Sequence, residues 1–143
     1  PASSWIDAMA VLSLDHVNIR TPDVPGTADF FCDLLGLRKG IAPGAASIET
    51  GCWVYDPADR PIIHIGPLDA AYPSIAMIPV TPARGGGSPH HVALECDDHA
   101  GIVARLEAAG LDYAVSDIPQ IGLRQIFVEE RNGILLELNF RNG

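Results

Sequence analysis

The 143-residue chain has few basic residues: nine Lys and Arg stand against eighteen Asp and Glu, and the formal net charge is −9 at pH 7. Binding to a nucleic-acid backbone needs clustered Lys and Arg side chains that neutralise phosphates. The basic residues of this chain are instead scattered along the sequence. The charge balance therefore argues against a nucleic-acid-binding function.

The chain also lacks a long hydrophobic run and any closely spaced pair of cysteines. Because no stretch of about 18 consecutive apolar residues occurs, we expect no membrane-spanning helix. The first residues show neither the basic nor the apolar region of a secretory signal. The three cysteines, Cys32, Cys52 and Cys96, are an odd number and far apart, which is typical of reduced thiols. We therefore expect a cytoplasmic protein without membrane or nucleic-acid partners.

What the chain does contain is an internal repeat. The letters LDHVNI around His16 recur as PHHVAL around His91, 75 residues later. Near the end of each half, PIIHI around His64 corresponds to LLEL around Glu137, 73 residues later. A repeat of this period indicates two copies of one supersecondary unit. Four side chains that can bind metal thus occupy two pairs of matching positions.

Each half of the sequence predicts the element order β-α-β-β-β. Apolar residues at spacings of three and four, closed by glycine, predict the helices, and short β-branched or alternating runs predict the strands. The Gly- and Pro-rich segment 81–89 predicts a linker. We expect an N-terminal extension (1–11), a first module (12–80), this linker and a second module (90–143). The expected strands are 12–19, a weakly defined one within 41–49, 52–55, 62–65, 91–96, 113–115, 124–129 and 134–140, and the helices are 28–35 and 99–109.

The repeat predicts a metal site built from His16, His64, His91 and Glu137. Strand side chains from four places converge only if the strands curl around a shared cavity. The expected fold is therefore α+β, with two paired βαβββ modules that form a curved mixed sheet around a central cavity. Three imidazoles and a carboxylate suit Fe, Ni, Zn, Co or Mn. A single strand histidine is more often a hydrogen-bonded core or surface residue, so the matching positions carry this hypothesis.

Other polar residues near these positions are expected to lie outside the site. His90 is predicted to point away from its neighbour His91, because successive strand residues face opposite sides. His99 is expected to be exposed at the start of its helix. The turn residues Asp56, Asp59, Glu129 and Glu130 are expected to form a solvated acidic surface.

Taken together, these motifs resemble the vicinal oxygen chelate superfamily, which includes glyoxalases, bleomycin resistance proteins and extradiol dioxygenases. The resemblance runs from about residue 12 to residue 140. It implies the paired-module, glyoxalase-like fold and a divalent metal ion held by His16, His91 and Glu137. It also implies a small-molecule substrate and a homodimer. The motifs that carry it are LDHV at 14–17, the segment 30–37, HVAL at 91–94, GLRQIFV at 122–128 and NGILLEL at 132–138.

The fourth position of the constellation departs from the best-understood relatives. Glyoxalase I has Glu there and methylmalonyl-CoA epimerase has Gln, whereas this chain has His64, which could bind the metal or act as a free acid–base group. The implied function is that of a metal-dependent lyase or isomerase of the glyoxalase/epimerase type, with His64 or Glu137 moving a proton. One alternative is a non-haem Fe(II) ring-cleavage-like dioxygenase, although that subfamily's signature Tyr falls at Phe127. Another is a metal-free small-molecule-binding resistance protein.

Overall fold

The structure, a computed structural model, describes residues 12–71, 83–87 and 89–141. Two four-stranded sheets and two longer helices make up this part of the chain. The first module contains β1 (Val17–Arg20), α2 (Val24–Leu35), β2 (Arg38–Ile41), the short 3₁₀ helix η1 (Ile48–Thr50), β3 (Cys52–Tyr55) and β4 (Pro61–Gly66). The second module contains β5 (Val92–Cys96), α3 (His99–Ala109), β6 (Tyr113–Ile118), the 3₁₀ helix η2 (Pro119–Ile121), β7 (Leu123–Glu129) and β8 (Leu135–Arg141).

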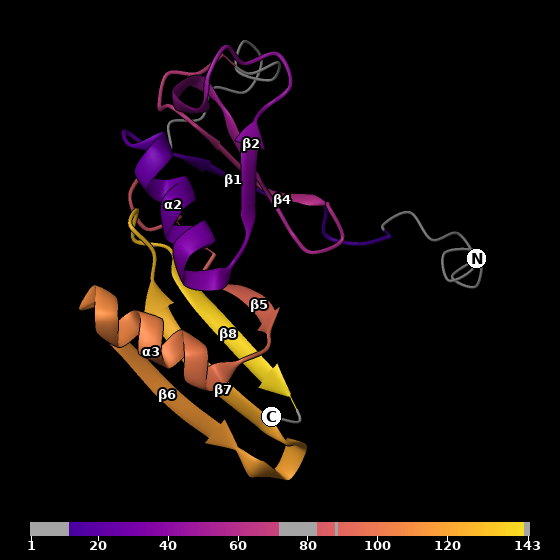
Figure 1. Cartoon of the computed structure of the whole chain (residues 1–143), viewed down its shortest axis with the longest axis vertical. Coiled ribbons are helices and arrows are strands. Elements are labelled where there is room, and N and C mark those ends of the chain that lie inside the picture. The colour runs from indigo at the N-terminus through magenta and orange to yellow at the C-terminus, as the bar shows by residue number, and fades with distance from the viewer. Residues whose placement is uncertain (1–11, 72–82, 88, 142–143) are drawn as a thin grey trace.

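Both modules have the same topology, which confirms the predicted α+β fold of two βαβββ units (Figure 1). The strand orders are β1-β4-β3-β2 and β5-β8-β7-β6. In each module the first strand pairs with the last in parallel, and the remaining neighbours are antiparallel. The helix supplies the crossover that a parallel pair requires.

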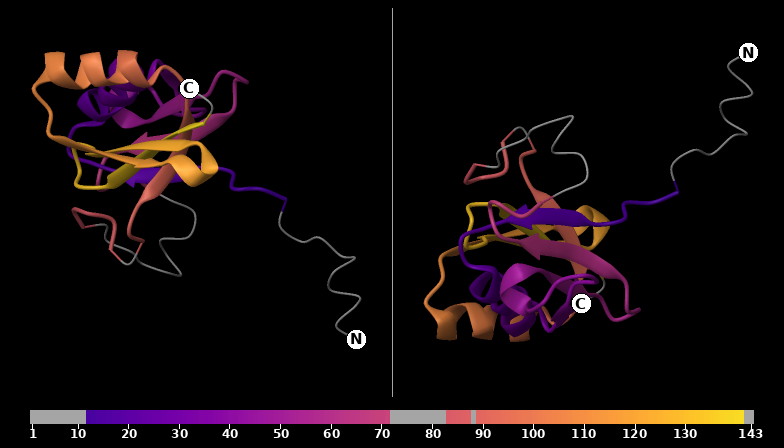
Figure 2. Two further views of the ribbon diagram at one scale, coloured as in Figure 1. Left: turned by 90° about the horizontal axis from the view of Figure 1, so that it is seen from below. Right: turned by 90° about the horizontal axis from the view of Figure 1, so that it is seen from above.

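The two helices lie on the same side of the two sheets, as both views in Figure 2 show. α2 contacts α3, and residues of both modules share one hydrophobic core. Alternate strand residues face this core, so the side chains between them point to the opposite face. The strand residues buried in this core are Ile19, Cys52, Val54, Ile63, Ile65, Ile126, Val128, Leu136, Leu138 and Phe140.

Local capping decides where the helices begin and end. Asp98 accepts a hydrogen bond from the Gly101 amide, and Gly110 ends α3 in the left-handed conformation, so that α3 matches its predicted bounds. α2 starts four residues before its predicted start. There the Asp23 side chain accepts a hydrogen bond from the Gly26 amide, and a proline occupies the first turn.

Two strands of the first module differ from their predicted positions. β1 begins only at Val17, and the alternating residues before it include Leu12 and Leu14, which are 86% and 80% exposed. The second strand is β2 at Arg38–Ile41, before the predicted segment 41–49, because its partner β3 sets its place. The end of the predicted first module (12–80) and part of the linker 81–89 lie outside the described residues, and the domain boundaries stay a prediction. No helix in the described ranges is long and apolar enough to cross a membrane.

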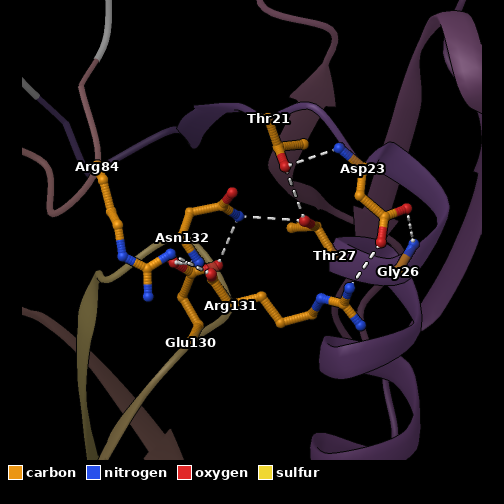
Figure 3. A network of polar contacts seen from close by, with 8 residues as sticks. All are labelled: Thr21, Asp23, Gly26, Thr27, Arg84, Glu130, Arg131 and Asn132. Carbon is orange, nitrogen blue, oxygen red and sulfur yellow. Dashed lines mark hydrogen bonds and ion pairs between the residues drawn. The ribbon is translucent and has the colours of Figure 1, made fainter.

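A polar network joins the start of α2 to the turn between β7 and β8, and we call it the latch (Figure 3). Arg131 Nη2 donates to Asp23 Oδ2 at 2.7 Å, and Asn132 Nδ2 donates to Thr27 Oγ1 at 3.1 Å. Glu130 is only 2% exposed and accepts hydrogen bonds from the amides of Asn132 and Ile134. The prediction that Glu130 is solvated is therefore wrong, because its carboxylate organises the turn that contacts the other module.

Candidate functional site

The strand registers place the four predicted site residues in equivalent positions of the two modules. Val17 is paired with Ile63 in the first module, as Val92 is with Leu136 in the second. His16 and His91 each precede the first of these strand residues, and His64 and Glu137 each follow the second. These residues lie on the face of each sheet that is turned away from the helices.

In the second module, His91 and Glu137 face one another and form what we call the second half-site. His91 Nε2 lies 3.7 Å from Glu137 Oε1, and Glu137 is the less exposed of the two side chains. His91 Nδ1 lies 3.0 Å from His90 Nδ1. The prediction that His90 points away from His91 is therefore wrong, because the His90 ring lies edge-on against it. Nδ1 of His91 is thus within hydrogen-bonding distance of His90, and Nε2 of His91 faces the Glu137 carboxylate.

In the first module, His16 and His64 form the first half-site. His16 Nδ1 lies 2.6 Å from Asp15 Oδ2. Because an ionised carboxylate only accepts hydrogen bonds, Nδ1 of the neutral ring carries the proton and Nε2 keeps its lone pair. A histidine that binds metal through one nitrogen commonly has its other nitrogen held in this way. In both modules, then, the residue before the strand-one histidine engages its Nδ1.

His64 is sandwiched between two other rings. Its ring stacks on His16 at a centroid distance of 3.7 Å with an interplanar angle of 12°, and on Trp53 at 4.2 Å and 11°. His64 Nε2 lies 3.1 Å from the Pro61 carbonyl oxygen. Because a carbonyl oxygen only accepts hydrogen bonds, Nε2 is the donor and the lone pair of the neutral ring lies on Nδ1. Burial, and after it the nearby His16, lowers the pKa of His64, which favours this neutral form.

The two half-sites differ in how well they could hold one metal ion. An ion about 2.1 Å from a nitrogen and an oxygen allows those atoms to be up to about 4.2 Å apart, so the His91–Glu137 pair, at 3.7 Å, fits a shared ion. An imidazole nitrogen directs its lone pair in the plane of its ring. The nearly parallel rings of His16 and His64 therefore cannot both point at one ion in this arrangement. The geometry of the His91–Glu137 pair therefore suits a shared ion, whereas that of the His16–His64 pair does not.

The structure brings the four predicted residues together as two pairs. Within the described ranges of this single chain, no group of three or more His, Cys, Asp or Glu side chains is placed to hold a metal ion. The convergence of all four on one point stays a prediction.

A cavity of about 550 Å³ opens beside the first half-site. Trp53, His64 and the loop Ala42–Ala45 line it, together with Gly51 and Gly66. In the second module the positions equivalent to these glycines are Gln125 and Asn139, whose side chains are nearly buried. The first module therefore leaves room for a small molecule where the second module is filled by amide side chains.

Two residues that shape the site, Trp53 and Asn139, were not predicted from the sequence. Trp53 stacks on His64, and Asn139 Nδ2 donates to Glu137 Oε2 at 2.9 Å. Strand alternation was the available signal, because Asn139 follows Glu137 by two residues and shares its face.

His99 is also not freely exposed as predicted: its Nε2 atom is buried without a hydrogen-bond partner in the described structure. Asp56 accepts hydrogen bonds from two amides and from Arg60, so it is a turn-forming group and not a solvated one.

Solved structures share the fold over nearly the whole chain. A protein from the mobile metagenome of V. pseudocholerae has a TM-score of 0.69 at 16% identity, covering 95% of this chain and 99% of that one. A lactoylglutathione lyase from Agrobacterium tumefaciens has a TM-score of 0.62 at 17% identity, with 92% and 95% covered.

A variant of the fosfomycin resistance protein FosX from Listeria monocytogenes, solved with Mn(II) and 1S,2S-dihydroxypropylphosphonic acid, has a TM-score of 0.63 at 16% identity, with 94% and 95% covered. No curated protein matches the sequence. The profile of one family does match, over residues 15–127. The chain therefore belongs to the glyoxalase/bleomycin resistance protein/dioxygenase superfamily.

Proposed function

We propose that the protein is a divalent-metal-dependent enzyme of the glyoxalase/epimerase type, acting on a small organic substrate with two neighbouring oxygens. One observation carries the proposal. In each module, the histidine just before the first strand has its Nδ1 atom within hydrogen-bonding distance of the preceding residue, and the last strand places His64 or Glu137 at the equivalent register position beside it. His16, His91 and Glu137 would hold the metal. When bound, a divalent cation supplies Lewis-acid polarisation of a substrate carbonyl. The FosX variant solved with Mn(II) supports a metal-binding role within the family.

The pairing of the residues supports a homodimer in which two chains build each site. His16 belongs to one half-site and His91 with Glu137 to the other, and in the described part of one chain no three candidate ligands gather. In our proposal, the first half-site of one chain faces the second half-site of its partner. A two-fold axis then creates two equivalent sites per dimer, because the same surfaces meet twice.

The remaining residues would bind substrate and move a proton. His64 offers the lone pair on Nδ1 as a base, while Pro61 and the stacked rings of His16 and Trp53 fix the orientation of its ring. The cavity beside Trp53 and the loop Ala42–Ala45 would hold the substrate. A proton on the carbon next to the substrate carbonyl would pass to His64 and return from it.

Mixing two variants tests the metal set and the dimer together. His16→Ala and His91→Ala should each bind no cobalt, measured on chelator-treated protein by titration with Co²⁺ alone. After the two variants are unfolded together and refolded, random pairing of chains should restore about a quarter of the sites, because only heterodimers contain one intact set. His99→Gln, a histidine outside the site, should bind Co²⁺ normally. Wild-type protein without stoichiometric Co²⁺ binding would refute the metal proposal, and no restoration in the mixture would refute the shared site.

Proton transfer is tested separately by deuterium exchange. With metal-loaded protein in D₂O, a panel of α-hydroxyketones and 2-methyl-3-oxo thioesters should incorporate deuterium next to the carbonyl, as followed by NMR. His64→Gln should retain Co²⁺ binding but lose the exchange. Exchange that persists unchanged in His64→Gln would remove His64 from the mechanism.

A second candidate function is non-haem Fe(II) oxygenation. Because the stacked rings of His16 and His64 cannot both bind one ion, we take His16, His91 and Glu137 as the ligand set. Two histidines with one carboxylate are typical of non-haem iron oxygenases. Anaerobic loading with Fe(II), followed by oxygen-uptake measurements with a catechol panel, tests it. Catechol-dependent oxygen uptake without deuterium exchange would favour this function over proton transfer.

A further inference from the structure

Two buried amide side chains lie in line behind the Glu137 carboxylate. Asn139 Nδ2 donates to Glu137 Oε2 at 2.9 Å, and Gln125 Nε2 donates to Asn139 Oδ1 at 3.1 Å. Asn139 and Gln125 are only 8% and 9% exposed. Buried amides are costly unless they are hydrogen-bonded, so these contacts hold both side chains in place.

The chemistry of the carboxylate sets the direction of this row. Because an ionised carboxylate only accepts hydrogen bonds, Asn139 must turn its NH₂ group toward Glu137. Its oxygen then faces Gln125, which must in turn present its own NH₂ group. Each amide therefore has one favourable orientation, and the row is polarised toward Glu137.

The hydrogen bond from Asn139 also decides which oxygen of Glu137 remains available to a metal ion. Oε2 of Glu137 is engaged by Asn139, while Oε1 is the atom that lies 3.7 Å from His91 Nε2. The equivalent positions of the first module are Gly51 and Gly66, so this row exists in the second module alone among the described residues.

We infer that Asn139 and Gln125 are positioning residues that fix Glu137 as a one-oxygen metal ligand through Oε1. The inference rests on the proposed metal-dependent function. Loss of a partner that orients a metal ligand typically weakens metal binding about 10- to 100-fold. Removing the Asn139 donor should free the carboxylate to rotate or to bind through both oxygens.

The experiment measures Co²⁺ affinity and the visible absorption of bound Co²⁺ in the full-length protein. Asn139→Leu, which keeps similar volume without a donor, should weaken Co²⁺ binding about 10-fold or more and alter the absorption bands. Gln125→Glu places an acceptor against Asn139 Oδ1 and should shift both readouts in the same direction. It also serves as the second variant if Asn139→Leu does not fold. Thr27→Val is the matched control, because it removes the hydrogen bonds of the buried Thr27 hydroxyl in the latch without contacting Glu137.

The outcomes separate this inference from the proposed function. If wild-type protein takes up no Co²⁺, the proposed function fails and the inference falls with it. If wild-type protein binds Co²⁺ and the folded Asn139 or Gln125 variants bind it equally well with the same spectrum, the inference alone is overturned. A loss of affinity of the same size in Thr27→Val would also overturn it, because the effect would then reflect general destabilisation.

Discussion

Replacing Glu130 by alanine should destabilise the fold strongly, although Glu130 lies outside the candidate site. The side chain is 2% exposed and accepts hydrogen bonds from Asn132 N at 2.6 Å, Asn132 Nδ2 at 2.9 Å and Ile134 N at 3.0 Å. Glu130→Ala leaves two backbone donors without their acceptor, and each buried unsatisfied donor costs about 1–3 kcal/mol. With loosening of the contact between Asn132 and Thr27, we expect a loss of about 3–5 kcal/mol.

A loss of this size is a large part of the 5–15 kcal/mol by which domains are stable, and it should lower Tm by about 10 °C or more. Urea unfolding followed by circular dichroism measures it. Glu130→Gln should cost less, because an amide oxygen can still accept the two backbone bonds. The matched control is Glu129→Ala: Glu129 is 61% exposed and contacts Arg84 at 3.5 Å, so the change should stay below about 0.5 kcal/mol. Equal losses for Glu130→Ala and Glu129→Ala would refute the reasoning.

Two further predictions follow from groups whose pKa is shifted by burial. Burial, and then the charge of Arg124, lowers the pKa of His99 below the ordinary 6.5. The folded state then binds fewer protons than the unfolded state near pH 6, so the free energy of unfolding should fall as pH drops below about 7. In urea titrations at several pH values His99→Gln should reduce this fall, and an unchanged pH dependence would contradict the assignment. Burial raises the pKa of Cys96 to about 11, so at pH 8 Cys96 should react slowly with a thiol reagent in the native state and rapidly in urea. The comparison with Cys96→Ser identifies its share of the reaction, and a fast native reaction lost in Cys96→Ser would contradict the prediction.

Elements with clear local signals were predictable from the sequence, whereas β2, which has no such signal, was not. α3 has its expected bounds because Asp98 and Gly110 mark its ends within the segment itself. β2 was missed because Arg38–Ile41 has no apolar run, and its strand conformation comes from pairing with β3. The alternation before Val17 predicted a longer first strand, yet those residues find no strand partner in the described structure.

The equivalent register positions of the four candidate residues were predictable from the sequence, but the orientation of their side chains was not. Matching spacings in the two halves placed His16, His64, His91 and Glu137 correctly in register. The hydrogen-bonded neighbours decide which nitrogen of each ring keeps its lone pair, and these include the Pro61 carbonyl oxygen, which no side-chain pattern reveals. Burial of Glu130 depends on a turn of one module meeting the other module, and this contact has no local signal either.

The two modules differ on the face beside the last strand, which is open in the first and occupied by amide side chains in the second. This difference affects which substitutions each module can accept during evolution. In the second half, Gln125 and Asn139 occupy the face beside the strand-four residue, whereas Gly51 and Gly66 leave that face open in the first. Substitutions in the loop Ala42–Ala45 would therefore reshape the open half without disturbing the amide row behind Glu137. Under the proposed function, such substitutions would change which substrate fits the first half while Glu137 keeps its surroundings in the second.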